Sequence, residues 1–309
     1  MTKSEIGLAI VMPVYEDRES VACLLRDLNA HLDRPFHVFA IEDGSIRNPL
    51  RLEDMTGAGV AGEILHLRRN MGHQRAIAAG LCHVNATCEP EMLVVMDSDG
   101  EDRADSIIEL VAALEEPGVE AAVAVRRSRQ DSMGFKLFYG WYKFVFRMLT
   151  GHWVSFGNFM ALRPAGLSRL TAMTETWLHL AGSLILSKLP VRKVPLDRGK
   201  RYRGQSKMNF SGLVLHGMRA VMVFAEDVLV RVGVACAGLV VASTLGVLVI
   251  LAMKLSGITS PGWATTAAGV MMLVGLQAGI LVLLLLLING TARSRAPLPD
   301  DAVERLFDR

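Results

Sequence analysis

Acidic residues, which can bind cations, stand directly after three short apolar segments of the chain. The apolar segments are Leu8–Met12, His37–Ile41 and Met92–Met96. The acids that follow them are, in order, Glu16 and Asp17, then Glu42 and Asp43, then Asp97, Asp99, Glu101 and Asp102. Carboxylates that share one crevice repel one another unless a positive charge lies among them. A divalent cation held by these oxygens and by a substrate diphosphate would supply that charge.

Each acidic segment also has a plain structural interpretation. Asp43-Gly44 is a common turn sequence, and the acids of 97–102 suit the loop and cap before a helix that starts near Ser106. None of the segments alone would therefore indicate a site. Their recurrence after three strands favours the functional interpretation, because strands that run the same way bring these acids to one edge of a sheet.

The elements that must position these acids follow from the hydrophobic pattern. Five apolar runs predict buried strands, at Leu8–Met12, His37–Ile41, Glu63–Leu67, Met92–Met96 and Ala121–Val125. Between them, residues 21–32 and 107–114 carry apolar side chains at helical spacing. Alternating strands and helices are typical of a mostly parallel α/β sheet with helices on both faces. Ligands of such sheets bind beyond the carboxyl ends of the strands, where the acids stand.

Two long apolar segments near the C-terminus predict membrane-spanning helices. Val232–Met253 and Ala264–Ile288 contain no charged residue, and each is long enough as a helix to cross a bilayer core of about 30 Å. The flanking cations are Arg219 and Arg231 before the pair and Arg293 and Arg295 after it. By the positive-inside rule both ends lie in the cytoplasm. We therefore expect an integral membrane protein with two spans and a cytoplasmic catalytic domain.

More than half of the chain's aromatic residues lie between Phe135 and Phe159, interleaved with basic residues. The segment is interpreted either as helices in the headgroup layer of a membrane, which is slightly favoured, or as helices with an ordinary aromatic core. Ser211–Phe224, directly before the first span, is also interpreted as an interfacial helix. The expected organisation is a catalytic domain over 1–210, a juxtamembrane amphipathic helix over 211–230, two spans over 231–290 and a cytoplasmic tail over 291–309.

Five short motifs, in their order along the chain, resemble those of glycosyltransferase family 2. They are Pro13-Val14-Tyr15-Glu16, Glu42-Asp43-Gly44-Ser45, Arg69-Asn70-Met71-Gly72-His73-Gln74, Asp97-x-Asp99-x-Glu101-Asp102 and Arg201-Tyr202-Arg203-Gly204-Gln205-Ser206-Lys207. The Asp-x-Asp pattern is weakly specific by itself. The full order, from about Ile6 to Lys207, resembles the polyprenyl-phosphate glycosyltransferases, the dolichol-phosphate mannosyltransferase-like branch. The two following spans are similar to those of bacterial members, which implies a bacterial inner membrane.

The resemblance implies a Rossmann-like GT-A fold and inverting transfer of a sugar from a nucleotide diphosphate sugar to a polyprenyl phosphate lipid. It also implies a requirement for Mg²⁺ or Mn²⁺. The nucleoside pocket would be lined by Pro13, Tyr15, Glu16 and Asp43, with Asp97 on its ribose side. Asp99, the first of the expected catalytic residues, would hold the metal together with Glu101. Family members often have glutamine at the position of Glu101, and a carboxylate is an equally good oxygen ligand.

Basic residues of the resembling motifs would bind phosphate groups. Arg201 and Lys207 are the other expected catalytic residues, and Ser206 lies between them at a phosphate group. Arg126 and Arg127, just past the fifth predicted strand, are expected at the acceptor phosphate. The alternatives are a solvated basic face for the latter two arginines and a juxtamembrane patch that binds anionic lipid for the run from Arg201 to Lys207.

The segment Gly157-Asn158-Phe159 departs from the Gly-Asp-Phe of many relatives, whose aspartate has been proposed as a base near the acceptor. Asn158 cannot accept a proton. A phosphate monoester has a second pKa of about 6 and is a largely ionised nucleophile at neutral pH, whereas a hydroxyl acceptor would need a base. Asn158 is therefore expected beside an acceptor phosphate, or the base lies elsewhere. His73 is interpreted either as a hydrogen-bond donor behind the site or as the first residue of a helix, and the structural role is favoured.

Composition leaves several classes of protein to compare. The net charge of +2 gives no indication of nucleic acid binding, and the four cysteines lack CxxC spacing, which indicates reduced thiols. A processive polysaccharide synthase would need more membrane helices, and a sugar-lipid transporter would need functional polar groups in its spans. Two other functions stay open: a non-catalytic membrane protein that binds nucleotide sugars, and a glycosyltransferase with another acceptor in polysaccharide or cell-envelope synthesis. Assembly into a homo-oligomer also stays open.

Overall fold

The computed structural model describes residues 4–127, 133–153, 155–203, 210–258, 262–292 and 306–307. Ser206 and Lys207, two of the expected phosphate-binding residues, lie outside these ranges. The chain divides into two compact units. The sheet unit comprises 1–135, 154–223 and 297–309, and the helical unit comprises 136–153 and 224–296.

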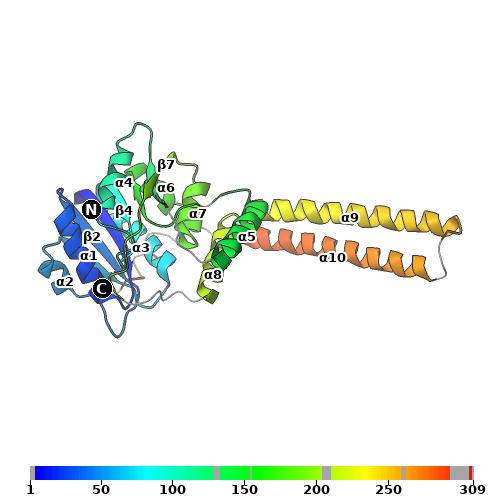
Figure 1. Ribbon diagram of the computed structural model, residues 1–309, viewed down its shortest axis with the longest axis horizontal. Coiled ribbons are helices and arrows are strands. Elements are labelled where there is room, and N and C mark those ends of the chain that lie inside the picture. The colour runs from blue at the N-terminus through cyan, green and yellow to red at the C-terminus, as the bar shows by residue number, and fades with distance from the viewer. Residues whose placement is uncertain are drawn as a thin grey trace. The chain divides into compact units, whose positions relative to one another are not determined.

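Within the described residues, seven strands form one sheet (Figure 1). They are β1 Ser4–Val14, β2 Phe36–Glu42, β3 Gly62–His66, β4 Cys88–Val95, β5 Ala121–Arg126, β6 Met160–Leu162 and β7 Val191–Leu196. Their spatial order is β3-β2-β1-β4-β6-β5-β7. Strand β6 is antiparallel to both of its neighbours, and all other pairs are parallel. The mostly parallel sheet is therefore confirmed, and β1 to β5 are the five predicted strands.

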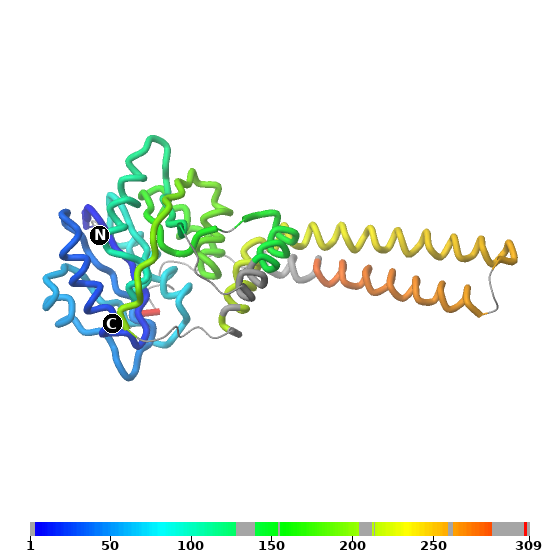
Figure 2. Tube along the Cα trace, in the orientation of Figure 1, coloured from blue at the N-terminus to red at the C-terminus, as the bar shows by residue number. Residues whose placement is uncertain are grey.

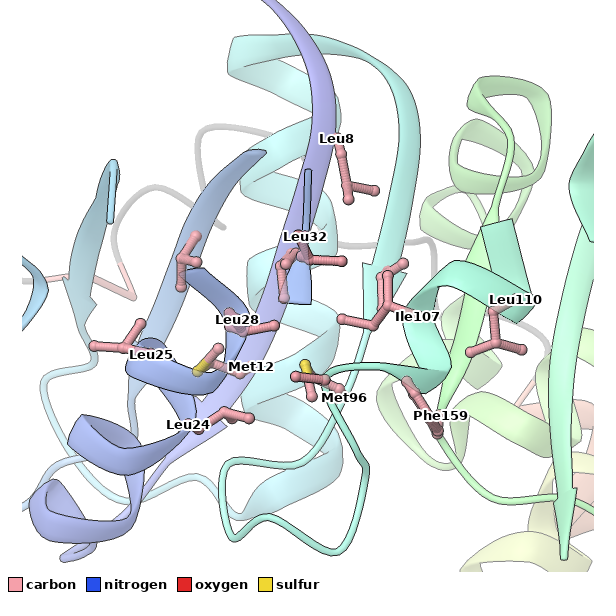
Figure 3. Close-up of a cluster of buried hydrophobic side chains, with 14 of the residues drawn as sticks. Leu8, Met12, Leu24, Leu25, Leu28, Leu32, Met96, Ile107, Leu110 and Phe159 are labelled. Carbon is pink, nitrogen blue, oxygen red and sulfur yellow. The ribbon is translucent and has the colours of Figure 1, made fainter. Parts of the chain in front are cut away.

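Helices cover both faces of this sheet. One face packs against α1 (Arg18–His31) and α4 (Ser106–Leu114), and the other against α3 (His73–Thr87), α6 (Pro164–Thr171) and α7 (Leu180–Leu186). Along β1, Leu8, Ile10 and Met12 belong to the first core, and the intervening Ala9 and Val11 to the second. Figure 3 shows Met12 among the leucines of α1, with Met96 and Ile107 beside them. Alternate side chains of β1 therefore enter two cores, because helices cover both faces of the sheet, and β1 lies between β2 and β4.

Three short elements complete the connections of the sheet unit. Helix α2 spans Leu52–Gly57, a 3₁₀ helix spans Thr174–Trp177, and α8 spans Phe210–Val223. Helix α8 packs against α7, because a side chain added at Gly182 would lie 3.3 Å from Val223. Figure 2 shows the chain returning at its C-terminal end, in red, to the sheet unit. There Phe307 forms an antiparallel bridge with Leu67, and its ring meets that of His83 edge-on, with centroids 5.6 Å apart.

The helical unit is built from three long helices. Helix α5 spans Met133–Thr150 and begins in the sheet unit, while α9 spans Ala225–Leu255 and α10 spans Trp263–Ala292. The last two lie side by side as an antiparallel pair (Figure 1), in which Gly275 approaches Ser243. Both are long and apolar enough to cross a membrane, and little of their surface is buried. The predicted pair of spans is thus present as two apolar C-terminal helices that could span a membrane.

Candidate active site

The carboxyl ends of β1, β2 and β4 bring the sequence-predicted acids to one edge of the sheet. These three strands are parallel neighbours, so the loops that follow them lie at the same edge of the sheet. The sequence predicted this arrangement from the acids that follow each strand. Two further segments join them there, the 67–73 loop before α3 and the 197–203 segment after β7. The site is therefore made by loops on a rigid scaffold of parallel strands, which is the usual place for ligands in this class of sheet.

The acids after β2 hold neighbouring backbone in place. The buried carboxylate of Asp43 accepts hydrogen bonds from the N–H groups of Met71, at 2.6 Å, and Gly72, at 2.9 Å. Burial raises the pKa of Asp43, and these two N–H groups oppose that rise. Gly44, with a φ of 69°, lets the loop come so close that an added Cβ would lie 2.5 Å from the nitrogen of Asn70. The loops after β2 and β3 are thus fixed to each other.

Glu42 has the same kind of role one residue earlier. Its buried carboxylate accepts a hydrogen bond from the hydroxyl of Ser45 and another, at 2.7 Å, from the N–H of Leu50. A carboxylate that receives such bonds does not need a cation for its stabilisation. Glu42 therefore shapes the 43–50 loop from within.

Glu16, expected in the nucleoside pocket, organises the same loop from the other side. Its carboxylate accepts hydrogen bonds from the N–H groups of Ile46 at 2.8 Å, Arg47 at 3.0 Å and Asn48 at 2.8 Å. The N–H groups of Arg47 and Ile46 hold the pKa of Glu16 below its usual range. Its neighbour Tyr15 is 43% exposed, whereas Pro13 is buried within β1. The expected contact of these residues with a nucleoside stays a prediction.

Asp99 and Glu101 converge on one guanidinium group. Nη2 of Arg201 lies 2.7 Å from Oδ2 of Asp99 and 3.6 Å from Oε1 of Glu101. Arg198 contacts the other oxygen of Glu101. Burial and the neighbouring charge of Asp97 raise the pKa of Asp99, while Arg201 opposes that rise. Two carboxylates of the predicted metal pair therefore face a common positive charge.

The segment that carries Arg201 is joined to the acidic loop by backbone. The N–H of Tyr202 donates to the carbonyl of Asp99 at 3.0 Å, and the N–H of Gly199 to that of Glu101 at 2.9 Å. The ring of Tyr202 covers Gly100, which has a φ of 87° and no room for a side chain. The hydroxyl of Tyr202 in turn donates to Asp27 on α1. The position of Arg201 thus follows from a rigid contact between two loops.

Asp97 stands between this pair and a second group of polar side chains. Nε2 of His73, at the start of α3, lies 3.2 Å from Oδ1 of Asp97 and 2.9 Å from Nδ2 of Asn158. The other end of the Asn158 amide accepts a hydrogen bond at 3.1 Å from Gln74. Asn158 therefore lies beside the acidic edge with both ends of its amide engaged, and its expected contact with an acceptor phosphate stays a prediction.

The remaining expected residues lie at the end of β5. Arg126 and Arg127 are exposed, and Nη1 of Arg127 lies 3.6 Å from Oδ2 of Asp197. Burial and the charge of Asp97 raise the pKa of Asp102. Arg126 is close enough to oppose this rise but does not cancel it. Within the described residues, neither arginine forms an ion pair with Asp99 or Glu101. The role of the two arginines at an acceptor phosphate stays a prediction.

Comparison with known families decides the class of protein. Residues 9–166, just over half of the chain, match Glycosyl transferase family 2. The chain belongs to this family. The fold agrees, since solved structures of similar architecture are GT-A glycosyltransferases. The protein is therefore a glycosyltransferase, and the resemblance of its motifs is confirmed at the level of the family.

Individual relatives of this glycosyltransferase extend the comparison. CsbB of Bacillus subtilis, whose name classes it as a glycosyltransferase, is 25% identical over 87% of this chain and 83% of its own length. The undecaprenyl-phosphate 4-deoxy-4-formamido-L-arabinose transferase of Klebsiella pneumoniae is 32% identical over 41% of this chain and 38% of its own. Glucosyl-3-phosphoglycerate synthase of Mycobacterium tuberculosis shares the fold, with a TM-score of 0.50 and 15% identity over 73% of this chain and 79% of its own.

Three side chains of the site were not recognised from the sequence as functional. Arg198 contacts Glu101, Gln74 contacts Asn158, and His73, for which a structural role was favoured, lies beside Asp97. The basic run around Arg198 was a usable signal, because an arginine so close to Arg201 suits the same acids. Gln74 and His73 belong to the Arg69–Gln74 motif, but that motif does not indicate their contact with Asn158, which is more than eighty residues away.

Proposed function

We propose that this glycosyltransferase moves a sugar from a nucleotide diphosphate donor to a polyprenyl phosphate at the cytoplasmic face of a membrane, with inversion at the anomeric carbon. The observation that carries the proposal is the convergence of Asp99 and Glu101 on Arg201 at the carboxyl edge of the sheet. The relative from Klebsiella acts, by its name, on undecaprenyl phosphate, and two apolar helices follow the catalytic unit in this chain. Both features favour a lipid acceptor.

The pair of acids fits a divalent cation. Hard oxygen ligands suit Mg²⁺ or Mn²⁺, and Mg²⁺ is commonly bound by one or two carboxylates together with substrate phosphates and water. Among the described residues, no group of three or more His, Cys, Asp and Glu side chains gathers for a metal. Asp99 and Glu101 would therefore hold the cation together with the donor diphosphate. The cation would neutralise the negative charge that develops on the diphosphate as it leaves. The Mycobacterium synthase was solved with Mn²⁺ and UDP-glucose, which supports the same expectation.

The residues of the chain account for the rest of the proposed displacement. An oxygen of the lipid phosphate forms a bond to the anomeric carbon, and the bond from that carbon to the donor diphosphate breaks. The bonding electrons leave with the nucleoside diphosphate. Arg201 and Arg198 lie beside the acids where that negative charge would develop, and preorganised cations of this kind stabilise a transition state. Because the attacking phosphate is already largely ionised at neutral pH, no side chain needs to remove a proton.

The membrane location rests on the helices and their flanking charges. In the helical unit, Trp141, Phe144 and Met148 lie on one side of α5 and are each more than half exposed. In the sheet unit, Val214, Leu215, Met218 and Met222 are likewise exposed on α8. Helices with such apolar surfaces bind in the interfacial layer of a bilayer. The proposed arrangement is a cytoplasmic catalytic unit, two interfacial helices and two spans, in a bacterial inner membrane.

Incubation of the purified protein with a panel of UDP- and GDP-sugars and a polyprenyl phosphate tests the proposal. We expect one labelled sugar to become extractable into organic solvent, only when Mg²⁺ or Mn²⁺ is present. The Asp99→Asn variant should insert and fold but transfer little. Transfer that persists in EDTA would refute the metal assignment, and transfer to a water-soluble acceptor alone would refute the lipid phosphate.

A further inference from the structure

The C-terminal segment of the chain docks on the edge of the catalytic sheet. Residues 297–309 belong to the sheet unit, although the preceding helix α10 belongs to the helical unit. The described part of this segment is drawn in red in Figure 2. Leu306 and Phe307 pack against the second core, and Phe307 is only 8% exposed. The last residues of a chain are usually poorly ordered unless they are tied down, so this burial points to a role for the segment.

The two docked residues hold the backbone that directly follows β3, the first strand in the order of the sheet. On the inner side, the N–H of Leu67 donates to the carbonyl of Glu42 at 2.9 Å. On the outer side, Phe307 forms an antiparallel bridge with Leu67. The N–H of Arg68 donates to the carbonyl of Leu306 at 3.1 Å, and Nε of Arg68 donates to that of Phe307 at 3.3 Å. The C-terminal residues thus take the place of the neighbouring strand that an edge strand lacks.

The loop that begins at this contact, residues 68–72, also forms part of the candidate site. The N–H groups of Met71 and Gly72 donate to the carboxylate of Asp43 at 2.6 Å and 2.9 Å, and Asp43 is expected in the nucleoside pocket. The side chain of Met71 packs against the same core as Phe307. The 68–72 loop is therefore held at two points, and the C-terminal segment supplies one of them.

The ring of Phe307 also connects the two elements that flank this loop. Leu67, at the start of the loop, is 3% exposed and pairs with Phe307. His83 lies on α3, the helix that follows the loop, and its ring centroid is 5.6 Å from that of Phe307. Closely packed side chains transmit displacements rather than absorb them. A ring packed between the end of β3 and α3 therefore limits the movement of the loop between them.

We propose that Leu306 and Phe307 are positioning residues, which hold the 68–72 loop in the conformation that binds the nucleotide sugar. This inference rests on the proposed donor and adds the C-terminal segment to the parts of the chain that determine its affinity. The two residues act through Leu67 and Arg68 and not on the reacting atoms. Without them the loop would become ordered only when the donor binds, and the cost of ordering would weaken donor binding.

Amide hydrogen exchange without any substrate tests the effect on the loop. In Phe307→Ala the N–H groups of Met71 and Gly72 should exchange about tenfold faster, because their hydrogen bonds to Asp43 open more often. The matched control is Leu114→Ala, which removes a buried side chain from the first core, on the other face of the sheet. It should leave these two amides unchanged. Equal acceleration in both variants would mean a general loss of stability and would refute the proposal.

Steady-state sugar transfer separates positioning from chemistry. In Phe307→Ala the KM for the sugar nucleotide should rise about tenfold, since fixing the backbone of one freed residue costs about that factor in affinity. The kcat at saturating donor should change little. Phe307→Leu keeps an apolar anchor and should have a KM close to that of the intact protein. A lower kcat at unchanged KM would contradict the positioning role. If the intact protein transfers no sugar to the lipid, the proposed function fails, while the exchange measurement still decides this inference.

A pair of cysteines tests the contact within a single protein. In a variant without the four native cysteines, Leu67→Cys and Phe307→Cys would face each other across the bridge. Oxidation should join them within one chain and slow the exchange of Met71 and Gly72 relative to the same protein after reduction. This comparison serves if Phe307→Ala does not fold. No crosslink, or a crosslink between two chains, would overturn the contact, and a crosslink without effect on the loop would overturn its positioning role.

Discussion

At the scale of residues, the site is organised by charges that must be balanced within a small volume. Asp97, Asp99 and Glu101 follow one strand, and burial raises the pKa of Asp99. Arg201 and Arg198 supply the balancing charge. Arginine suits this position because its guanidinium stays protonated and offers several donors in a fixed plane. A diphosphate entering this edge would meet both the arginines and a cation held by the acids.

Removal of Arg201 should affect turnover more than folding. In Arg201→Ala we expect sugar transfer to fall by about 10²-fold, the usual effect of losing one preorganised group that stabilises developing charge. Arg201→Lys should recover part of that loss, because the charge returns without the planar fork. Initial rates at saturating donor measure the effect. The matched control is Arg203→Ala, an exposed arginine of the same segment that pairs with Glu19; equal losses in both variants would contradict the assignment.

Two neighbouring histidines, buried His179 and partly buried His216, should govern stability at low pH. Nε2 of His179, at the start of α7, lies 3.2 Å from Nε2 of His216 on α8. Burial, together with His216 and the more distant His73, lowers the pKa of His179 to about 3. Burial also lowers the pKa of His216. In the unfolded chain each histidine would have a pKa of about 6.5.

The sign of the effect follows from which state binds the proton. Between about pH 6.5 and pH 3 the unfolded chain binds a proton that folded His179 refuses, so stability falls as the pH falls through this window. The free energy of unfolding should drop by about 1.4 kcal/mol per pH unit for this histidine. His179→Asn, which can still cap Gly182, should reduce that slope, while exposed His31→Asn should not. Urea unfolding at several pH values measures both, and equal slopes would contradict the prediction.

At the scale of elements, the sequence predicted the strands that contain a run of apolar residues, β1 to β5. Most of these strands are buried, and β3 is an edge strand whose residues are only partly buried. Strand β7 was not predicted, because Arg192, Lys193 and Pro195 interrupt it; as an edge strand it has one side that is not paired. Strand β6 has three residues, too few for any period to appear. Its antiparallel direction depends on the tertiary path of the chain.

The site could be predicted only to the extent that strand ends could be placed. The acids at the ends of β1, β2 and β4 were found because parallel strands end together. That Glu16 and Asp43 bind backbone N–H groups could not be predicted, since it depends on loops that fold back from the next strand. The contact of Arg198 and Arg201 with the acids likewise joins segments about a hundred residues apart, so the basic run alone could not show which acids it meets.

The junction of the two loops at Gly100 should be sensitive to a single methyl group. Gly100→Ala would place a Cβ against the ring of Tyr202 at a positive φ, so we expect a loss of stability greater than the ~1 kcal/mol of the backbone strain itself. Transfer should fall with it, because Tyr202 adjoins Arg201. Gly118→Ala is the matched control, since Gly118 has a φ of 78° and open space around it. Similar melting temperatures of the two variants would show that Tyr202 does not constrain the loop.

At the scale of the whole molecule, a polar catalytic unit and an apolar helical unit are joined in one chain. The sheet unit buries its leucines, isoleucines and valines in two cores. The helical unit instead exposes such side chains along both α9 and α10. In water this exposed apolar surface would be costly, whereas in a bilayer it needs no covering. We therefore expect the helical unit to determine where the enzyme resides.

The turn between α9 and α10 distinguishes the two orientations that this unit could take in a membrane. Arginines flank the outer ends of the pair, so the positive-inside rule predicts that Ser256 faces the side opposite to the catalytic unit. In a variant lacking the four native cysteines, Ser256→Cys should react with a membrane-impermeant maleimide in intact cells. Asp33→Cys, on an exposed loop of the sheet unit, should react only after lysis. The reverse pattern would place the acids on the wrong side of the membrane for a cytoplasmic sugar nucleotide, and labelling of both in intact cells would mean that the helices do not span it.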